Sequence, residues 1–316
     1  MNNNKITLRI ISVADTLVNV AVIIVMMILF IYGVFAIWDT QAVVETASPA
    51  QYKPYRPSTN NKEKFIELTA KNDEVLGWLT LYGTNIDYPL VQGEDNRKYL
   101  TMDTQKQYSM SGAIFLDCNN NPSFEDFNTI IYGHHMAYNA MFGDISDFTK
   151  QSFFDTHRYG NLYYDGKDHG IEFFAFMEVE AYSSHVYTPG LTGGEEQQKY
   201  LEQIYEEAMY SRDIGVSTEN RIVLLSTCVQ SMTNGRHLLI GAIRDQVYED
   251  IFKEETGKKE VLRIDDASSD ELWNLVSLWM LIIIAIMVIG LILASGSKGQ
   301  HVQRKPMMQD KKSKEK

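Results

Sequence analysis

The sequence predicts a mainly β domain flanked by two transmembrane helices. Short β-prone runs recur through the middle of the chain with turn residues between them, which is the pattern of a β-barrel or a β-sandwich. Two longer apolar runs, at 20–38 and 272–294, contain no charged residue. Each is long enough to cross a bilayer, which takes about 20 apolar residues.

The first apolar run belongs to a predicted membrane anchor at 17–38, which follows a cytoplasmic N-terminus at 1–16. Its apolar core is longer than the roughly 7 to 15 residues that form the core of a signal peptide. No convincing small-residue cleavage site follows it closely. We therefore expect an uncleaved transmembrane helix rather than a signal peptide.

The second apolar run predicts a transmembrane helix at 272–294, and a basic tail at 295–316 follows it. Lys5 and Arg9 precede the first span, and seven cationic residues follow the second. Because cationic flanks stay on the cytoplasmic side, both termini are predicted to be cytoplasmic. The protein would then cross the cell membrane twice and hold its central domain on the extracellular face.

The region between the two spans divides into three parts by composition. Residues 39–60 are rich in Pro, Ser, Thr, Ala and Tyr and predict a linker, and residues 61–247 form the domain. The mixed-charge residues 248–271 predict a tether to the second span.

Inside the domain, the spacing of apolar residues predicts two helices and about eight strands. The helices are expected at 61–72 and 194–211. In chain order, the strands are expected at 75–81, 85–91, 113–117, 128–132, 160–164, 170–182, 221–225 and 238–243.

The charge distribution excludes one class of partner. The formal net charge is −12, the segment to Thr16 contributes +1 and the segment after Ser297 contributes +5, so the remainder carries −18. Nucleic acid is excluded, since its binding requires cationic side chains that neutralise phosphates. No cluster has zinc-ligand spacing and no phosphate-binding glycine loop occurs, so we expect neither a metal nor a cofactor.

The segment 221–244 holds the first two candidate catalytic residues. Cys228 follows one predicted strand, Arg236 opens the next, and Thr233, Asn234 and Gly235 supply turn residues between them. If the two strands pair as a hairpin, the guanidinium lies beside the sulfur. A fixed cation favours the thiolate and can stabilise a developing oxyanion, as nucleophilic acyl transfer requires.

A proton carrier is the third requirement, and His134 is the candidate because it follows Gly133 at the end of the strand at 128–132. His135 is its rival, and only one of the two can face Cys228 because consecutive strand residues point to opposite faces. His237 is expected to be a surface residue. Spacing alone leaves the opposing interpretation open, since a lone cysteine is more often a small buried hydrophobe.

These residues carry a resemblance to a known family. Thr227-Cys228, Arg236 and Gly133-His134 resemble the signature of the sortases, the membrane-bound cysteine transpeptidases of Gram-positive surfaces. Further motifs resemble the class B branch, and the similarity runs from about Phe65 to Ile243. These motifs are Gly-Trp-Leu at 77–79, the segment at 83–89 and Asp-Asn-Arg-Lys-Tyr-Leu at 95–100.

The resemblance implies a fold and a set of roles. The fold would be a closed β-barrel of about eight strands, with an N-terminal helix and a helix inserted before the cysteine strand. Cys228 would attack a backbone carbonyl, His134 would transfer the proton and Arg236 would stabilise the oxyanion. The resemblance also implies a substrate groove lined by Asn96, Leu100, Ser183, Tyr187, Thr188, Ser226 and Thr227.

The implied substrates are secreted proteins that carry a C-terminal sorting signal. The acceptor would be a peptidoglycan precursor amine, as in most class B sortases, or a pilin lysine. The second predicted span departs from the class B pattern and is common among pilus-polymerising sortases, whereas the Asp-Pro-aromatic lid of class C is missing. Two other classes stay open, a non-catalytic membrane-tethered scaffold and a hydrolytic cysteine protease.

Besides Cys228, the chain contains one further cysteine, Cys118. An extracellular pair could form a structural disulfide, but such a bond would remove the nucleophile, so the two interpretations exclude each other. We expect Cys118 to be a non-catalytic thiol.

Overall fold

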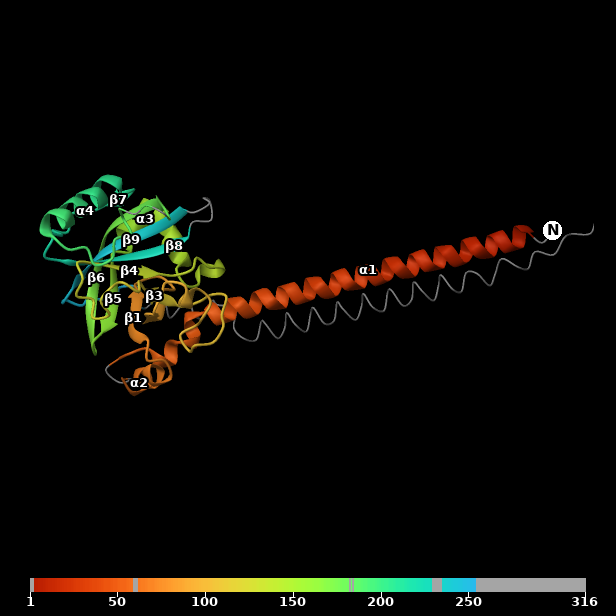
Figure 1. Ribbon diagram of the computed structural model, residues 1–316, viewed down its shortest axis with the longest axis horizontal. Helices are drawn as coiled ribbons and strands as arrows, with labels where there is room; N and C mark the ends of the chain where they lie inside the picture. The colour runs from red at the N-terminus through yellow and green to blue at the C-terminus, as the bar shows by residue number, and fades with distance from the viewer. Residues whose placement is uncertain (1–2, 59–61, 182, 184, 229–234, 254–316) are drawn as a thin grey trace, which may run out of the picture. The chain divides into compact units, whose positions relative to one another are not determined.

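The structure is a computed structural model that describes residues 3–58, 62–181, 183, 185–228 and 235–253 (Figure 1). Its larger unit, Val34–Gly257, contains a β-barrel, and its smaller unit includes the N-terminal residues to Gly33.

Helix α1 (Asn3–Ala47) contains the predicted anchor. Its segment Ile6–Ala36 is long and apolar enough to cross a membrane, and the apolar side chains along it are exposed. Such a surface suits a lipid environment, which is consistent with membrane anchoring. The predicted second span at 272–294 and the basic tail lie outside the described residues.

Cysteine accessibility tests the predicted two-pass topology. In a chain whose two native cysteines are replaced, a cysteine at the exposed Lys53 or at Asp265 should react with a membrane-impermeant reagent on intact cells. A cysteine at Lys311 should react only after permeabilisation, because the cationic tail is expected inside. Labelling of position 311 on intact cells would show that the topology is wrong.

The strands form one sheet in the order β5-β1-β2-β3-β4-β8-β9-β6-β7, and the additional pairing of β5 with β6 closes the first eight into a barrel (Figure 1). The predicted closed barrel is therefore confirmed, and the short β7 adds to β6. The strands are β1 (Val75–Leu81), β2 (Asp87–Val91), β3 (Ile114–Leu116), β4 (Asn128–Tyr132), β5 (Tyr159–Tyr164), β6 (Lys167–Glu180), β7 (Tyr210–Ser211), β8 (Arg221–Cys228) and β9 (Gly235–Arg244).

Helix α4 (Gly194–Glu207) covers the outer face of the barrel at β6, β8 and β9. Tyr200, Leu201 and Ile204 of this helix are buried against one row of strand residues, which includes Ile222, Leu224, Leu238 and Ile240. The alternate residues Val223, Leu225 and Leu239 belong to the other cluster, inside the barrel. Strands β8 and β9 are thus apolar on both faces, as expected of strands buried on both sides.

The other helices agree with the sequence in part. Helix α2 (Lys62–Lys71) matches the predicted helix at 61–72. The predicted helix at 194–211 ends earlier, because Met209 N donates to Phe176 O at 2.8 Å and Tyr210–Ser211 pairs with β6. Unpredicted short helices are α3 (Gln151–Thr156) and the 3₁₀ helices η1 (Pro49–Gln51), η2 (Lys53–Tyr55), η3 (Lys98–Leu100), η4 (Ala137–Asn139) and η5 (Gly143–Thr149).

The described part of the predicted linker at 39–60 is not a free spacer, because it contacts the barrel. Helix α1 continues to Ala47, whose carbonyl oxygen accepts a hydrogen bond from the Tyr88 hydroxyl at 2.8 Å. Tyr52, only 3% exposed, packs edge-on against Tyr88 with ring centroids 6.2 Å apart. Aromatic burial therefore fixes this end of the segment to the barrel.

The start of the predicted tether at 248–271 also lies against the barrel. Tyr248 stacks on Tyr159 at a centroid distance of 4.1 Å, and Phe252 stacks on His157 at 4.7 Å. The sequence predicted a tether because this run is of mixed charge with little apolar periodicity. The remainder of the tether lies outside the described residues.

Candidate active site

Strands β4, β8 and β9 lie next to one another, and their pairing aligns the three predicted catalytic residues. In the parallel pair of β4 and β8, Tyr132 is opposite Ser226, and in the antiparallel pair of β8 and β9, Cys228 is opposite Arg236. Two residues beyond Tyr132 on one strand and beyond Ser226 on the next come His134 and Cys228. The backbone therefore places the positions of His134, Cys228 and Arg236 side by side at the ends of three adjacent strands.

Gly133 determines how the chain leaves β4 toward His134. Its N–H donates to Ser226 O at 3.2 Å, which extends the pairing with β8 by one residue. A Cβ atom here would lie 2.6 Å from Ile114 Cδ1 and 2.7 Å from the Phe142 ring, so a larger residue does not fit. The glycine thus permits the close packing that holds the backbone just before His134.

His134 is half-buried, and both its ring and its backbone carbonyl make a polar contact. Its Nε2 lies 2.9 Å from Leu100 O, and its carbonyl oxygen accepts from Phe142 N at 2.9 Å. The contact with Leu100 links two residues that the resemblance assigned to one site. The imidazole also stays partly accessible, as a proton carrier requires.

Arg236 is the second residue of β9 and is half-buried, and its Nη1 donates to Gly235 O at 3.1 Å. Among the described residues it forms no ion pair. Arg244, at the other end of β9, donates from Nη2 to Ile214 O at 3.0 Å, and its Nε lies 3.9 Å from Glu172 Oε2. The two arginines of this strand therefore have different surroundings among the described residues.

Tyr187 covers the strand that leads to Cys228. Its hydroxyl lies 2.9 Å from the Oγ of Ser226, and its ring stacks on Tyr132 with centroids 6.3 Å apart. Ser226 is only 2% exposed beneath this contact. Two predicted groove residues, Tyr187 and Ser226, are thus brought together at β8, two residues before Cys228.

Asp117 is a residue of this region that sequence reasoning missed. Its buried carboxylate accepts from Asn96 Nδ2 at 2.8 Å and from the Tyr132 hydroxyl at 2.9 Å. It therefore connects Asn96, a predicted groove residue, to the ring on which Tyr187 stacks. The only sequence signal was an aspartate at the end of a predicted strand.

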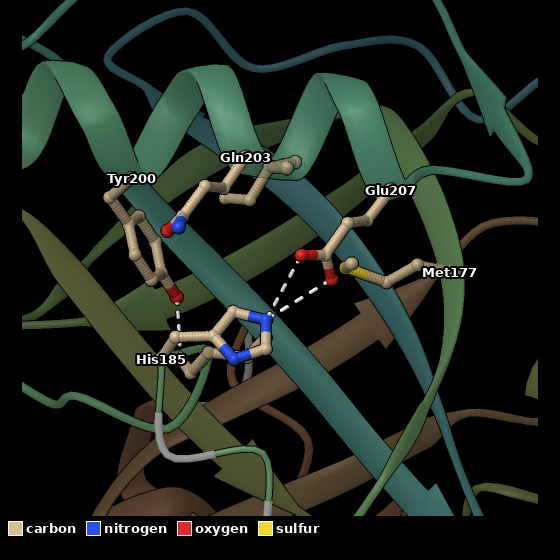
Figure 2. A pocket seen from close by; sticks show the side chains of 7 residues that line it. Met177, His185, Tyr200, Gln203 and Glu207 are labelled. Carbon is tan, nitrogen blue, oxygen red and sulfur yellow. Dashed lines mark hydrogen bonds and ion pairs between the residues drawn. The ribbon is translucent and has the colours of Figure 1, made fainter.

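The connection between β6 and α4 carries the remaining predicted groove residues. The carbonyl of Ser183 accepts from the Val186 N–H, and that of Thr188 accepts from Asn128 Nδ2 at 2.7 Å. Figure 2 shows how this connection is fixed to α4: the Tyr200 hydroxyl donates to Val186 O, and His185 Nε2 lies 3.1 Å from Glu207. These residues line a small cleft between the connection and α4.

Thr227 and His237 lie inside the barrel. They pair across β8 and β9, and they are 2% and 4% exposed. The Thr227 side chain therefore cannot contact a substrate in the groove, so only its backbone is available for that role. The prediction that His237 is a surface residue is wrong, because alternation turns it away from the face of its neighbour Arg236.

Cys118 lies outside this alignment, two residues after β3 ends, and is a free, half-buried thiol. Burial and the neighbouring Asp117 carboxylate raise the pKa of its thiol. A cysteine in such surroundings is mostly protonated at neutral pH and hence a poor nucleophile.

Comparisons with known proteins identify the family. No protein-family model matches the chain. Sortase B of Staphylococcus aureus is 30% identical over 187 residues, which cover 58% of this chain and 75% of that protein. Sortase B of Listeria monocytogenes is 32% identical over 169 residues, with 53% and 68% covered.

Comparison with solved structures identifies the same family. Sortase B from the type II pilus of Streptococcus pneumoniae is 51% identical with a TM-score of 0.51, and the match covers 57% of this chain and 98% of that one. A class B sortase of Streptococcus pyogenes involved in pilus biogenesis is 39% identical with a TM-score of 0.53, covering 57% and 97%. Together with the closed barrel, these matches show that the chain belongs to the sortase B family of cysteine transpeptidases.

Proposed function

We propose that this protein is a membrane-anchored sortase that cleaves a sorting signal in secreted proteins and transfers the acyl group to a pilin lysine. The observation that carries the proposal is the strand pairing that aligns the positions of His134, Cys228 and Arg236 in a member of this family. The apolar α1 would hold the enzyme at the cell membrane, where its substrates emerge.

The reaction proceeds in two steps. The Cys228 thiolate attacks the carbonyl carbon of the scissile peptide bond, and Arg236 stabilises the oxyanion that forms. His134 donates a proton to the leaving nitrogen, so the C-terminal tail departs as an amine and a thioester remains. His134 then accepts a proton from the incoming amine, which displaces the thiolate and forms the new amide bond.

The groove contacts support this assignment. Tyr187 and Ser226 lie on the outer face of the barrel beside the strand end, and Asn96 is joined to them through Asp117 and Tyr132. An extended peptide that lies along this face would meet Tyr187 before it reaches Cys228. Leu100 and His134 border the same end of the barrel.

The choice of a pilin lysine rests on the relatives. The two pilus-associated sortases are 51% and 39% identical, whereas the two curated sortase B proteins are 30% and 32% identical. The predicted second span, common among pilus-polymerising sortases, points the same way. Attachment to peptidoglycan is the competing outcome.

A competition experiment tests the acceptor. Detergent-solubilised full-length enzyme is incubated with a cognate sorting peptide, an equimolar folded pilin and a peptidoglycan crossbridge peptide, and the products are identified by mass spectrometry. We expect at least about tenfold more pilin isopeptide than crossbridge adduct, since differential binding of about 1.4 kcal/mol gives that ratio. A dominant crossbridge adduct would support anchoring, and hydrolysis unaffected by either amine would indicate a protease.

A further inference from the structure

Each predicted catalytic residue has a neighbour in the sequence that points to the other side of the barrel wall. These neighbours are His135 after His134, Thr227 before Cys228, and His237 after Arg236. Strand alternation places Thr227 and His237 inside, where they pair directly with each other and are 2% and 4% exposed, and His135, beyond the end of β4, is half-buried. A mostly buried polar group therefore lies behind the active-site face, and the reaction scheme above does not use it.

His237 is the best-connected member of this group. Its Nδ1 lies 3.4 Å from Ser146 Oγ of η5, and its Nε2 lies 3.8 Å from Glu178 Oε2 of β6. The ring of Phe176, also on β6, lies 5.3 Å away between centroids. A single imidazole thus joins β9 to two other elements at the level of Arg236.

A neutral imidazole with its proton on Nε2 suits these surroundings. The Ser146 hydroxyl can then donate to Nδ1 while the Nε2–H faces the Glu178 carboxylate. Burial lowers the pKa of His237, the nearby His135 lowers it further, and Glu178 opposes both. Burial also lowers the pKa of His135. When both histidines are uncharged, they repel neither each other nor the Arg236 guanidinium.

We propose that His237 is a positioning residue, which holds the start of β9 through Ser146 and Glu178 so that Arg236 stays opposite Cys228 of the paired strand β8. The inference rests on the proposed function for its kinetic consequence. Its geometric basis does not depend on that function, because the contacts of His237 are present in the fold itself. Small displacements of catalytic groups cost far more in rate than in stability, so the effect should appear in turnover.

The test compares two substitutions of His237 in full-length enzyme carrying Cys118→Ala, so that Cys228 is the remaining native cysteine. His237→Gln keeps hydrogen-bonding groups near Ser146 and Glu178, whereas His237→Leu keeps the bulk without them. We expect His237→Leu to lower kcat about tenfold with KM changed less than about twofold, and His237→Gln to retain kcat within about threefold.

His169 provides the matched control. It is 3% exposed, lies at the opposite end of β6 and stacks on Tyr164 at 4.0 Å. His169→Leu should lower the melting temperature as His237→Leu does while leaving kcat within about twofold, because it removes a buried imidazole far from the site.

Alkylation of Cys228 by a methanethiosulfonate reagent separates this inference from the proposed function, since it requires no transpeptidation. We expect His237→Leu to slow alkylation about tenfold and His237→Gln to leave it nearly unchanged, because the thiolate depends on the cation beside it. Unchanged kcat and alkylation in His237→Leu, or equal losses in His169→Leu, would overturn the positioning role. If His237→Leu slows alkylation as expected but the native enzyme transfers no acyl group, the proposed function alone would be rejected.

Discussion

Replacement of Cys228 by alanine should abolish cleavage of a cognate sorting peptide. Without the sulfur no thioester can form. We expect kcat/KM to fall by at least about a thousandfold, as when the nucleophile of an acyl-transfer enzyme is removed. The measurement is peptide cleavage followed by mass spectrometry, together with circular dichroism to verify that the fold is retained.

Cys118→Ala is the control for this experiment. Because burial and Asp117 raise the pKa of the Cys118 thiol, it contributes little thiolate at neutral pH. The variant should keep its activity within about twofold, as expected for a residue without a chemical role. An inactive Cys118→Ala enzyme, or a Cys118–Cys228 disulfide in the native protein, would contradict the assignment of the nucleophile.

The strands of the barrel could be predicted because their signals are local. The expected strands at 75–81 and 128–132 coincide with β1 and β4, since each is a β-prone run bounded by turn residues. Strand β7 has two residues, too few for any periodicity, and depends on pairing with Ala175 and Phe176 of β6. Its tertiary partner overrides the helical pattern that continues through Tyr210.

Within the site, the pairing of Cys228 with Arg236 could be predicted because a hairpin is a short-range feature. The parallel pairing of β4 with β8 joins residues 94 positions apart, Tyr132 and Ser226 among them, and no local pattern predicts it. The contacts of Asp117 with Tyr132 and Asn96 depend on the pairing of β3 with β4 and on a loop 21 residues upstream, which no local pattern brings together.

The position of His237 could have been predicted from the sequence. Alternation shows that only one of His134 and His135 can face Cys228, and the same rule, with Arg236 on the outer face, places His237 inside the barrel. The two nitrogens of this buried imidazole lie 3.4 Å from Ser146 Oγ and 3.8 Å from Glu178 Oε2. The rule was sufficient, but the partners come from distant segments that the sequence alone does not bring together.

Arg236→Lys should lower kcat/KM by on the order of a hundredfold while leaving the melting temperature unchanged. A hundredfold loss corresponds to about 2.7 kcal/mol of transition-state stabilisation. The charge is kept in this variant, so the loss would measure the planar guanidinium. Lysine offers a point charge on a flexible stem and cannot reproduce a bidentate geometry.

Arg244→Lys tests whether the loss is specific to the strand end beside Cys228. Arg244 lies on the same strand but is bound to Ile214 O and lies near Glu172, so its role is structural. A lysine there should change stability by about 0 to 1 kcal/mol, the range of partly exposed ion pairs, and leave kcat/KM unaffected. If Arg236 were only a solvated strand residue, both variants would behave in this way. Turnover lost in Arg244→Lys but kept in Arg236→Lys would mean that the pairing of Cys228 with Arg236 has no part in the chemistry.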